Sequence, residues 1–309
     1  MHPFTDDPAR SVSALGEAKL IAAIRRWLGR VSPCAPFGVG DDCAVLRPAR
    51  GRQLITVDPV IFGRHFDARV SPRAAGAKLL KRNLSDIAAM GGRPVAAVLA
   101  VTLDPRVHLR WLELFYRGLA VAARRYRVVI VGGDLAESPG VVAAGLTLLG
   151  QATSRRILTR TGARAGDWIF VTGVLGASRP SGHHLRFAPR LAEGSWLARR
   201  PAVRSMMDVS DGLAKDLPAL TPRGCVAALD EAAVPLRRGA TFRAALTDGE
   251  DYELLFSVAA SANRADLARA WTRKFPRTRL TCIGRFSAGT TPPCGCLRLD
   301  DYRGYEHFR

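Results

Sequence analysis

Apolar positions recur along this chain with two different periods, and the two periods predict where helices and strands form. An apolar residue at every third or fourth position predicts amphipathic helices over 15–29, 74–90, 108–125 and 261–274. Short runs rich in valine, isoleucine and leucine predict strands over 43–46, 53–57, 95–103, 128–131, 141–149, 168–172, 225–229, 253–258 and 280–283. Residues 173–190 are rich in Gly, Ser, Pro and His and are expected to form no regular element.

Predicted helices and strands are mixed from one end of the chain to the other. This mixture is typical of the α/β (α+β) class, with mixed sheets flanked by helices. A length of 309 residues exceeds the usual size of one domain. The composition turns polar and rich in arginine near 151–164, as expected at a domain boundary. We therefore expect two α/β domains, at residues 1–152 and 153–309.

The sequence carries no sign of a membrane or secreted protein. None of its apolar runs reaches the 18 or so uncharged residues that a membrane helix needs. The first residues lack the basic-then-apolar order of a signal peptide. The 6 cysteines follow neither a disulfide framework nor a paired zinc-ligand spacing. These features predict a cytoplasmic protein that does not bind membranes.

The chain is strongly basic, with 46 Lys and Arg against 27 Asp and Glu and a formal net charge of +19. Clustered cations bind nucleic acids by neutralising their phosphates. Here, however, arginine is spread along the whole chain, and no basic block alternates with stacking aromatics. We interpret the charge first as a solvated surface and second as an attraction for small anionic substrates. Binding of nucleic acid is the least expected of the three.

Against this basic background, acidic residues recur beside apolar runs or at helix edges: Asp41 with Asp42, Asp58, Asp86, Asp134, Asp208 with Asp211, and Glu250 with Asp251. Any one of them is accounted for as a turn former or a helix cap, so the recurrence carries the argument. If they converge, two carboxylates 4 Å apart repel by about 4 kcal/mol at an effective dielectric near 20. A cation must then lie among them. Oxygen ligands without His or Cys select a hard ion, which points to Mg²⁺ bridging phosphates.

Two spacings support convergence of the acids. In an extended stretch, Asp208 and Ser210 share one face, and Asp211 is placed to start the helix that follows. Asn83 and Asp86 are three residues apart, which puts them on the same face of the predicted helix.

The glycines before Asp134 are a further, weaker sign of phosphate binding. Gly132 and Gly133 follow an apolar run and have no Cβ, so backbone N–H groups there can approach a phosphate closely. The chain contains neither the G-x-x-x-x-G-K-[ST] loop nor the set of protein-kinase motifs. Phosphate chemistry in this protein therefore belongs to another class.

The acidic segments and their neighbours form an ordered set along nearly the whole chain: LGE at 15–17, GVGDDCAVL at 38–46, NLSDIAAMGGRP at 83–94, GGD at 132–134, LTRTGARAGDWIFVTG at 158–173, MDVSDGL at 207–213, GEDYELLF at 249–256, CIGR at 282–285 and GYEHF at 304–308. In this order they resemble the thiamine-monophosphate kinase family, within the superfamily of aminoimidazole ribonucleotide synthetase. The motifs GEDYELLF and GYEHF favour this family over its relatives.

The resemblance implies a fold, an activity and an assembly. It implies two α/β domains of the aminoimidazole ribonucleotide synthetase-like type, with residues 1–152 as the ATP- and Mg²⁺-binding and dimerisation domain and 153–309 as the C-terminal domain. It implies direct in-line transfer of the γ-phosphoryl group of ATP to thiamine monophosphate, which gives thiamine diphosphate and ADP. It also implies several Mg²⁺ ions and a homodimer formed through the N-terminal domain.

The resemblance also assigns roles to residues of this chain. The ligands of Mg²⁺ would be Asp42, Thr56, Asp58, Asp86, Asp134, Asp208 and Asp211. Contacts to ATP would come from Gly133, Asp134, Arg160 and Ser210, and contacts to the thiamine substrate from His65, Glu250 and Tyr305. The catalytic residues would be Asp211, Arg160 and Asp134.

The chain departs from the family pattern in two places, and alternatives stay open. Val57 stands where the family usually has a hydroxyl residue, and the stretches 174–207 and 213–248 are short. Another ATP-dependent enzyme of the superfamily with a different acceptor is one alternative. A degenerate, non-catalytic homologue that binds nucleotide or RNA is the other. His65 is also consistent with a strand end, Arg160 with a linker, and Tyr305 with simple packing.

Overall fold

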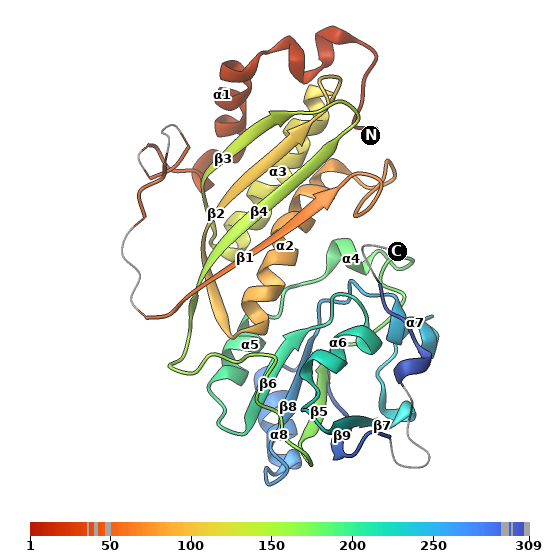
Figure 1. Cartoon of the computed structure of the whole chain (residues 1–309). Coiled ribbons are helices and arrows are strands. Elements are labelled where there is room, and N and C mark those ends of the chain that lie inside the picture. The colour runs from red at the N-terminus through yellow and green to blue at the C-terminus, as the bar shows by residue number, and fades with distance from the viewer. Residues whose placement is uncertain (36, 40–42, 47–50, 292–296, 298, 306–309) are drawn as a thin grey trace. The chain divides into compact units, whose positions relative to one another are not determined.

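The structure is a computed structural model that describes residues 1–35, 37–39, 43–46, 51–291, 297 and 299–305. Its contacts divide the chain into two compact units, each with its own sheet (Figure 1). The first unit comprises residues 1–87 and 93–151, and the second comprises 88–92 and 152–309. No helix among the described residues is both long and apolar enough to span a membrane.

The first unit is a four-stranded sheet with helices. Its elements are the 3₁₀ turns Pro8–Arg10, Val12–Ala14 and Gly29–Val31, the helices α1 Glu17–Leu28, α2 Pro72–Ala89 and α3 Leu109–Tyr126, and the strands β1 Gln53–Ile61, β2 Gly92–Leu103, β3 Val129–Glu137 and β4 Val142–Ala152. The strand order is β1-β4-β2-β3, with β1 and β4 antiparallel and β2 and β3 parallel. Helices α2 and α3 cover one face of the sheet, and α1 packs on α3 (Figure 1).

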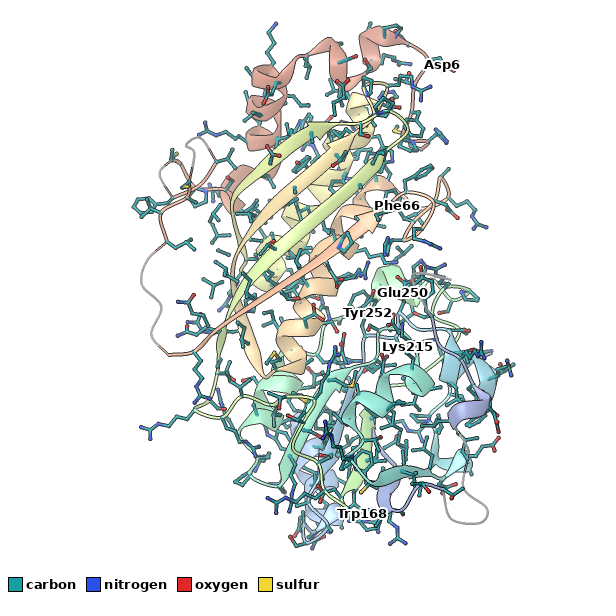
Figure 2. All side chains as sticks on the ribbon, viewed as in Figure 1. Asp6, Phe66, Trp168, Lys215, Glu250 and Tyr252 are labelled. Carbon is teal, nitrogen blue, oxygen red and sulfur yellow. The ribbon has the colours of Figure 1, made fainter. Side chains whose placement is uncertain are left out.

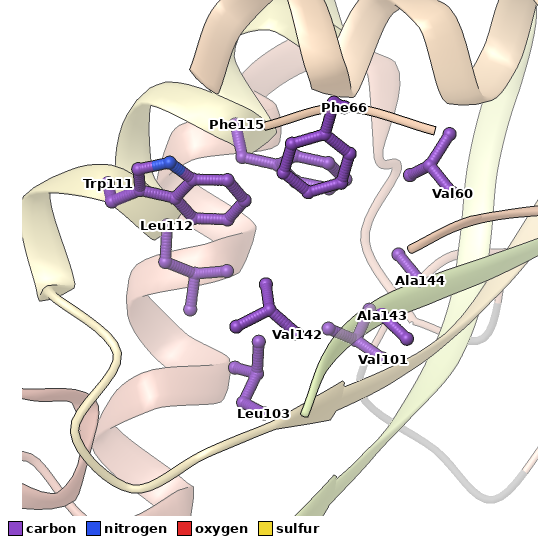
Figure 3. A pocket seen from close by; sticks show the side chains of 10 residues that line it. All are labelled: Val60, Phe66, Val101, Leu103, Trp111, Leu112, Phe115, Val142, Ala143 and Ala144. Carbon is purple, nitrogen blue, oxygen red and sulfur yellow. The ribbon is translucent and has the colours of Figure 1, made fainter. Parts of the chain in front are cut away.

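The covered face of this sheet is well filled. Phe66 stacks on Trp111, which stacks on Phe115, with ring centroids 5.8 and 5.5 Å apart. Together with Val60 and Val142 these rings line an apolar cavity of only about 10 Å³ (Figure 3). A space of that size is at the lower limit for one water molecule, so the core of the unit is close-packed.

The other face of the same sheet is apolar and uncovered. Burial alternates along β1, as a strand requires, with Leu54 and Val60 turned inward. The outward residues include Ile55, Val57 and Ile61, which are 71%, 66% and 39% exposed. A surface of this kind on a β-sheet is a candidate for contact with another protein surface.

The second unit is a five-stranded antiparallel sheet between helices. Its elements are the strands β5 Trp168–Thr172, β6 Val203–Asp208, β7 Cys225–Leu229, β8 Leu254–Val258 and β9 Leu280–Ala288, the helices α4 His183–Arg186, α5 Leu191–Ala198, α6 Leu213–Leu220, α7 Phe242–Thr247 and α8 Arg264–Lys274, and the 3₁₀ turns Glu231–Ala233 and Leu299–Asp301. The strand order is β6-β8-β5-β9-β7. Alternate residues of β5 enter two cores, Ile169 and Val171 one and Phe170 the other. Two mixed α/β units confirm the predicted fold class.

Three predictions from the sequence are wrong, and three elements were missed. Residues 43–46 form no strand, and with Val45 and Leu46 exposed they lack the neighbour that an apolar strand needs. The stretch 173–190 does contain a regular element, the single turn α4, which follows Gly182 in a left-handed conformation (φ 70°). Two short helices (α5 and α7) and the strand β6 were not predicted. Asp211 does not start a helix, because α6 begins at Leu213 with Gly212 as its N-cap.

Candidate active site

In the first unit, strand β1 and helix α2 bring three of the predicted ligands together. Thr56 and Asp58 are two residues apart on β1, so their side chains leave the same face, toward α2. The hydroxyl of Thr56 donates a hydrogen bond to Asp86 Oδ2, 2.5 Å away on α2. Asn83 holds the two elements in register, because its amide donates to the carbonyl oxygens of Leu79 (2.9 Å) and Asp58 (3.4 Å). The result is a cluster of oxygen donors, which we call the β1–α2 cluster.

A basic residue that the sequence reasoning missed lies in this cluster. Arg82 Nη2 lies 3.3 Å from Asp58 Oδ1, and its Nη1 donates to the carbonyl oxygen of Pro59 over 2.6 Å. A signal existed in the sequence, because Arg82 and Asp86 are four residues apart and therefore share a helix face. Val57, in contrast, lies on the opposite face of β1 and takes no part in the cluster.

His65 lies just after β1 and is 8% exposed. Its Nδ1 accepts a hydrogen bond from the backbone N–H of Ile61 (3.1 Å), which places the ring proton of the neutral imidazole on Nε2. The buried Lys78 of α2 donates to the His65 carbonyl oxygen over 2.8 Å. The His65 side chain thus stabilises the turn after β1, and its Nε2–H group is a hydrogen-bond donor.

A pocket of about 430 Å³ opens beside β3 in the same unit. Its apolar wall includes Ile24 and Leu28 of α1 and Tyr116 of α3, and its other wall includes Gly133 and Asp134. This volume lies in the range that small-molecule sites occupy, and an apolar wall facing a carboxylate suits a ligand with a ring and a charged end. Sequence reasoning found Gly133 and Asp134 but not the apolar wall, because its residues lie far apart in the chain.

Strand packing requires a glycine at position 133, and the sequence alone did not show this. A bulge in the pairing of β2 with β3 shifts the register near Val98, and the chains then approach closely. A Cβ on Gly133 would lie 2.3 Å from the carbonyl oxygen of Leu99, whereas one on Gly132 would meet its nearest neighbour at an ordinary 3.5 Å. Gly133 is therefore required by strand packing, whatever else approaches it.

In the second unit, the segment after β6 is held by a buried carboxylate. Asp216 Oδ2 accepts hydrogen bonds from the backbone N–H groups of Ser210 (2.9 Å) and Asp211 (3.0 Å). Burial raises the pKa of Asp216 to about 7, and the nearby charges of Asp208 and Asp211 act in the same direction. Asp216 thereby fixes the backbone that carries Ser210 and Asp211, a role that the sequence reasoning did not assign.

The C-terminal segment runs directly beside Asp211. The backbone N–H of Tyr305 donates to the carbonyl oxygen of Asp211 over 3.0 Å. Lys215 Nζ lies 2.9 Å from Asp211 Oδ2 and also donates to the Tyr305 carbonyl oxygen. The approach is so close that a Cβ on Gly304 would lie 2.6 Å from the Asp211 carbonyl oxygen. Two predicted site residues that are far apart in the sequence, Asp211 and Tyr305, are thus neighbours.

Glu250 lies on a strained connection that leads into β8 (Figure 2). Glu250 and Tyr252 both have left-handed backbones, with φ of 56° and 52°, which costs a non-glycine residue energy and is typical of functional loops. Arg179 Nε lies 3.0 Å from Glu250 Oε2. The buried Asp251 anchors the connection, because it accepts from the N–H of Gly176 and pairs with Arg237 at 3.0 Å.

Comparison with known proteins decides the family. The model of the AIR synthase related protein N-terminal domain matches residues 40–152. The curated thiamine-monophosphate kinase of Escherichia coli (strain K12) is 35% identical over 96% of this chain and 99% of its own. The chain belongs to the thiamine-monophosphate kinase family.

Solved structures agree with this assignment. The thiamine-monophosphate kinase from Stenotrophomonas maltophilia K279a is 31% identical over 90% of this chain and 96% of its own, with a TM-score of 0.74. AaThiL, solved in complex with AMPPCP and TMP, is 28% identical over 96% of this chain and 98% of its own, with a TM-score of 0.71. The fold that the resemblance implied is therefore confirmed.

Two further residues that the thiamine-monophosphate kinase resemblance implied are Arg160 and Asp42. Arg160 is exposed, next to Thr159, whose carbonyl oxygen accepts from the backbone N–H of Met206 in β6. Arg160 therefore runs along the edge of the strand that ends at Asp208. Asp42 lies outside the described residues.

The acidic residues that the structure describes do not gather into a metal site by themselves. Across the described ranges, no group of three or more His, Cys, Asp or Glu residues is close enough to hold a metal ion. What the thiamine-monophosphate kinase fold provides instead is partial sets of oxygen donors, such as Thr56 with Asp86. This is the arrangement that Mg²⁺ uses when one or two carboxylates bind it together with the phosphates of a ligand.

Proposed function

We propose that this protein is a thiamine-monophosphate kinase, which transfers the γ-phosphoryl group of ATP to thiamine monophosphate and so forms thiamine diphosphate and ADP. The observation that carries the proposal is the 35% identity to the Escherichia coli enzyme over 96% of this chain. The relative AaThiL was solved with AMPPCP and TMP, which supports a nucleotide and a second ligand in this fold. The enzyme is proposed to work in the cytoplasm.

A site built mainly of carboxylates agrees with this chemistry. The acceptor is itself a phosphate anion, so the reaction needs positioning and neutralisation of charge rather than a covalent intermediate. The carboxylates of the site, without a cation, would repel both ligands.

Magnesium fits the donors that the chain offers. Hydroxyl and carboxylate oxygens without sulfur or imidazole are the ligands of a hard cation. We propose as ligands Asp42, Thr56, Asp58, Asp86, Asp134, Asp208 and Asp211. When bound, Mg²⁺ supplies the positive charge that neutralises the phosphates.

For the nucleotide, we propose the pocket beside β3. Its apolar wall with Tyr116 suits a purine ring, and Gly133 and Asp134 form the polar wall. We further propose that Arg160 and Ser210 contact the phosphates, with Arg160 stabilising the group in transfer.

For the acceptor, we propose contacts from His65, Glu250 and Tyr305. Thiamine monophosphate carries a cationic thiazolium ring, which a carboxylate and an aromatic face both attract. The hydrogen bond between Tyr305 and the Asp211 carbonyl links this contact to a proposed metal ligand.

We propose that the enzyme is a homodimer formed through residues 1–152, with 153–309 as the C-terminal domain. The uncovered apolar face of the first sheet, with Ile55, Val57 and Ile61, supports this assembly. Burying such a face against a second copy removes it from water.

A coupled assay of ADP release with Mg²⁺ tests the function. We expect ADP to form with thiamine monophosphate and not with thiamine or with other phosphomonoesters. ADP release with a different phosphomonoester alone would favour another enzyme of the superfamily. Salt-sensitive binding of RNA with no turnover of ATP would favour a non-catalytic homologue.

A further inference from the structure

The cationic residue inside the β1–α2 cluster has no role in the proposed function so far. The Arg82 side chain is only 12% exposed and its partner Asp58 is 26% exposed. Salt screens a mostly buried ion pair only weakly, so the positive charge of Arg82 has a strong effect on the electrostatic potential at the site. Arg82 therefore alters the electrostatics of the β1–α2 cluster more than a surface arginine would.

Arg82 is anchored independently of the carboxylate that it faces. Its Nη1 donates to the carbonyl oxygen of Pro59 over 2.6 Å, and its Nη2 lies 3.3 Å from Asp58 Oδ1. The shorter contact is to the backbone of β1. The guanidinium is consequently held beside Asp58 whether or not the carboxylate turns toward another cation.

The two carboxylates of the β1–α2 cluster have different partners. Asp86 accepts a hydrogen bond from the Thr56 hydroxyl, a neutral donor, at 2.5 Å. Asp58 faces the positive charge of Arg82. The pair of Asp58 with Arg82 is therefore a place in the cluster where a divalent ion would meet a fixed positive charge.

The neighbouring lysine shows why an arginine suits this place. Burial lowers the pKa of Lys81 to about 8, and the charges of Arg125 and Lys78 act in the same direction. Burial thus makes an amine easier to deprotonate, whereas a guanidinium keeps its charge when buried. The cation beside Asp58 is thus permanent over the physiological pH range.

We propose that Arg82 is a built-in cation of the Mg²⁺ site, which occupies one side of Asp58 and lowers by one the number of divalent ions that the site binds. The inference rests on the proposed function, because it takes the β1–α2 cluster to bind Mg²⁺. Arg82 acts on the ions through Asp58 and is a positioning residue. A neutral residue at 82 would restore the full attraction of two carboxylates for a second divalent ion.

Mn²⁺ binding to the full chain tests the proposal, measured by electron paramagnetic resonance with and without a non-hydrolysable ATP analogue. We expect R82M to bind one Mn²⁺ more than the wild type, or to bind its weakest Mn²⁺ at least tenfold more tightly. R82K places an ammonium beside Asp58, whose negative charge favours the protonated form, and is expected to bind as the wild type does. The matched control R117M removes an arginine that pairs with Glu113 on α3, away from the β1–α2 cluster, and should change nothing.

The outcomes separate this role from a structural one. A purely structural ion pair between β1 and α2 predicts that R82M lowers the melting temperature and leaves the number and affinity of bound Mn²⁺ unchanged, which would overturn the proposal. If R82M does not fold, R82Q repeats the test, because its amide is neutral and still able to donate to Pro59. Turnover of ATP with thiamine monophosphate by the wild type is followed in parallel. If the wild type does not turn over ATP with thiamine monophosphate, the proposed function is contradicted. If R82M binds Mn²⁺ in the same number and with the same affinity as the wild type, only the role of Arg82 is contradicted.

Discussion

In the second unit, Asp211, a proposed ligand of Mg²⁺, is held by contacts to three other residues. Asp211 pairs with Lys215, and its carbonyl oxygen accepts from Tyr305. Its own N–H donates to Asp216. Because the side chain and the backbone of Asp211 have separate partners, changing the carboxylate alone should leave the segment in place.

We predict that Asp211→Asn lowers turnover more than tenfold while the fold survives. The amide keeps the size of the side chain but loses the charge that attracts Mg²⁺. Steady-state turnover at saturating Mg²⁺ and the circular dichroism spectrum check both parts. Asp266→Asn on α8, where the side chain is 61% exposed, is the matched control. Wild-type turnover in Asp211→Asn would remove this residue from the site.

A second prediction concerns stability and pH. The pKa of Asp216 is about 7 in the folded protein against an ordinary 3.8, so between these values the folded state binds a proton that the unfolded state has released. The free energy of unfolding should therefore fall as the pH rises from about 4 to about 7. Asp216→Asn, whose amide oxygen still accepts both N–H groups, should weaken this dependence.

Urea denaturation at pH 5 and pH 8, in the presence of a chelator, measures the effect. Asp251, whose pKa burial raises to about 6, contributes in the same direction and should leave part of the dependence in the variant. Equal dependence on pH in the wild type and in Asp216→Asn would contradict the assignment.

At the scale of elements, long periodic segments were predictable and short ones were not. The helices over 15–29, 74–90, 108–125 and 261–274 are confirmed as α1, α2, α3 and α8, because each is long enough to show its period. The 8 residues of α5 are largely apolar and the 6 residues of α7 span under two turns, so neither reveals a face. Strand β9 continues to Ala288, five residues past its predicted end, because pairing with β7 supports residues of low strand propensity.

The site was predictable to the same limited degree. The acids stood out because carboxylates next to apolar runs recur, and the structure brings Thr56 to Asp86 and Asp211 to Tyr305. Arg82 and Asp216 were missed, since the sequence shows at most which helix face such a residue shares and not which strand or loop it will meet. Which long-range partners a side chain finds is decided by tertiary packing, which the local pattern does not contain.

The bulge between β2 and β3 allows a test of how the glycines are used. We predict that Gly133→Ala destabilises the protein by about 1–3 kcal/mol, because its Cβ would lie 2.3 Å from the Leu99 carbonyl oxygen. Gly132→Ala, with its nearest contact at 3.5 Å, is the matched control and should cost less. Chemical denaturation measures both variants. Equal stability of Gly133→Ala and Gly132→Ala would show that β2 and β3 move apart at the bulge to make room for the Cβ.

At the scale of the whole molecule, the uncovered sheet face predicts an assembly. Val57→Lys places a charge on that face and should shift a homodimer toward monomer in sedimentation velocity. Val121→Lys is the control, since Val121 is 53% exposed on α3 and not on the sheet. A wild type that sediments as a monomer at all concentrations would contradict the proposed dimer.

The net charge of +19 also belongs to this scale. It does not set the family, because the ordered motifs and the full-length similarity do that. A basic molecule attracts anionic ligands from a distance, and the proposed acidic ligands then need divalent cations to receive them. The basic surface and the acidic site are thus compatible parts of one phosphate-transferring enzyme.

The most direct test follows the transferred atom group itself. The protein is incubated with Mg²⁺, thiamine monophosphate and ATP labelled at the γ-phosphate, and the products are separated by chromatography. Our account predicts that the label appears in thiamine diphosphate, in equal amount to the ADP formed. Label found only in inorganic phosphate, or retained in ATP, would contradict it.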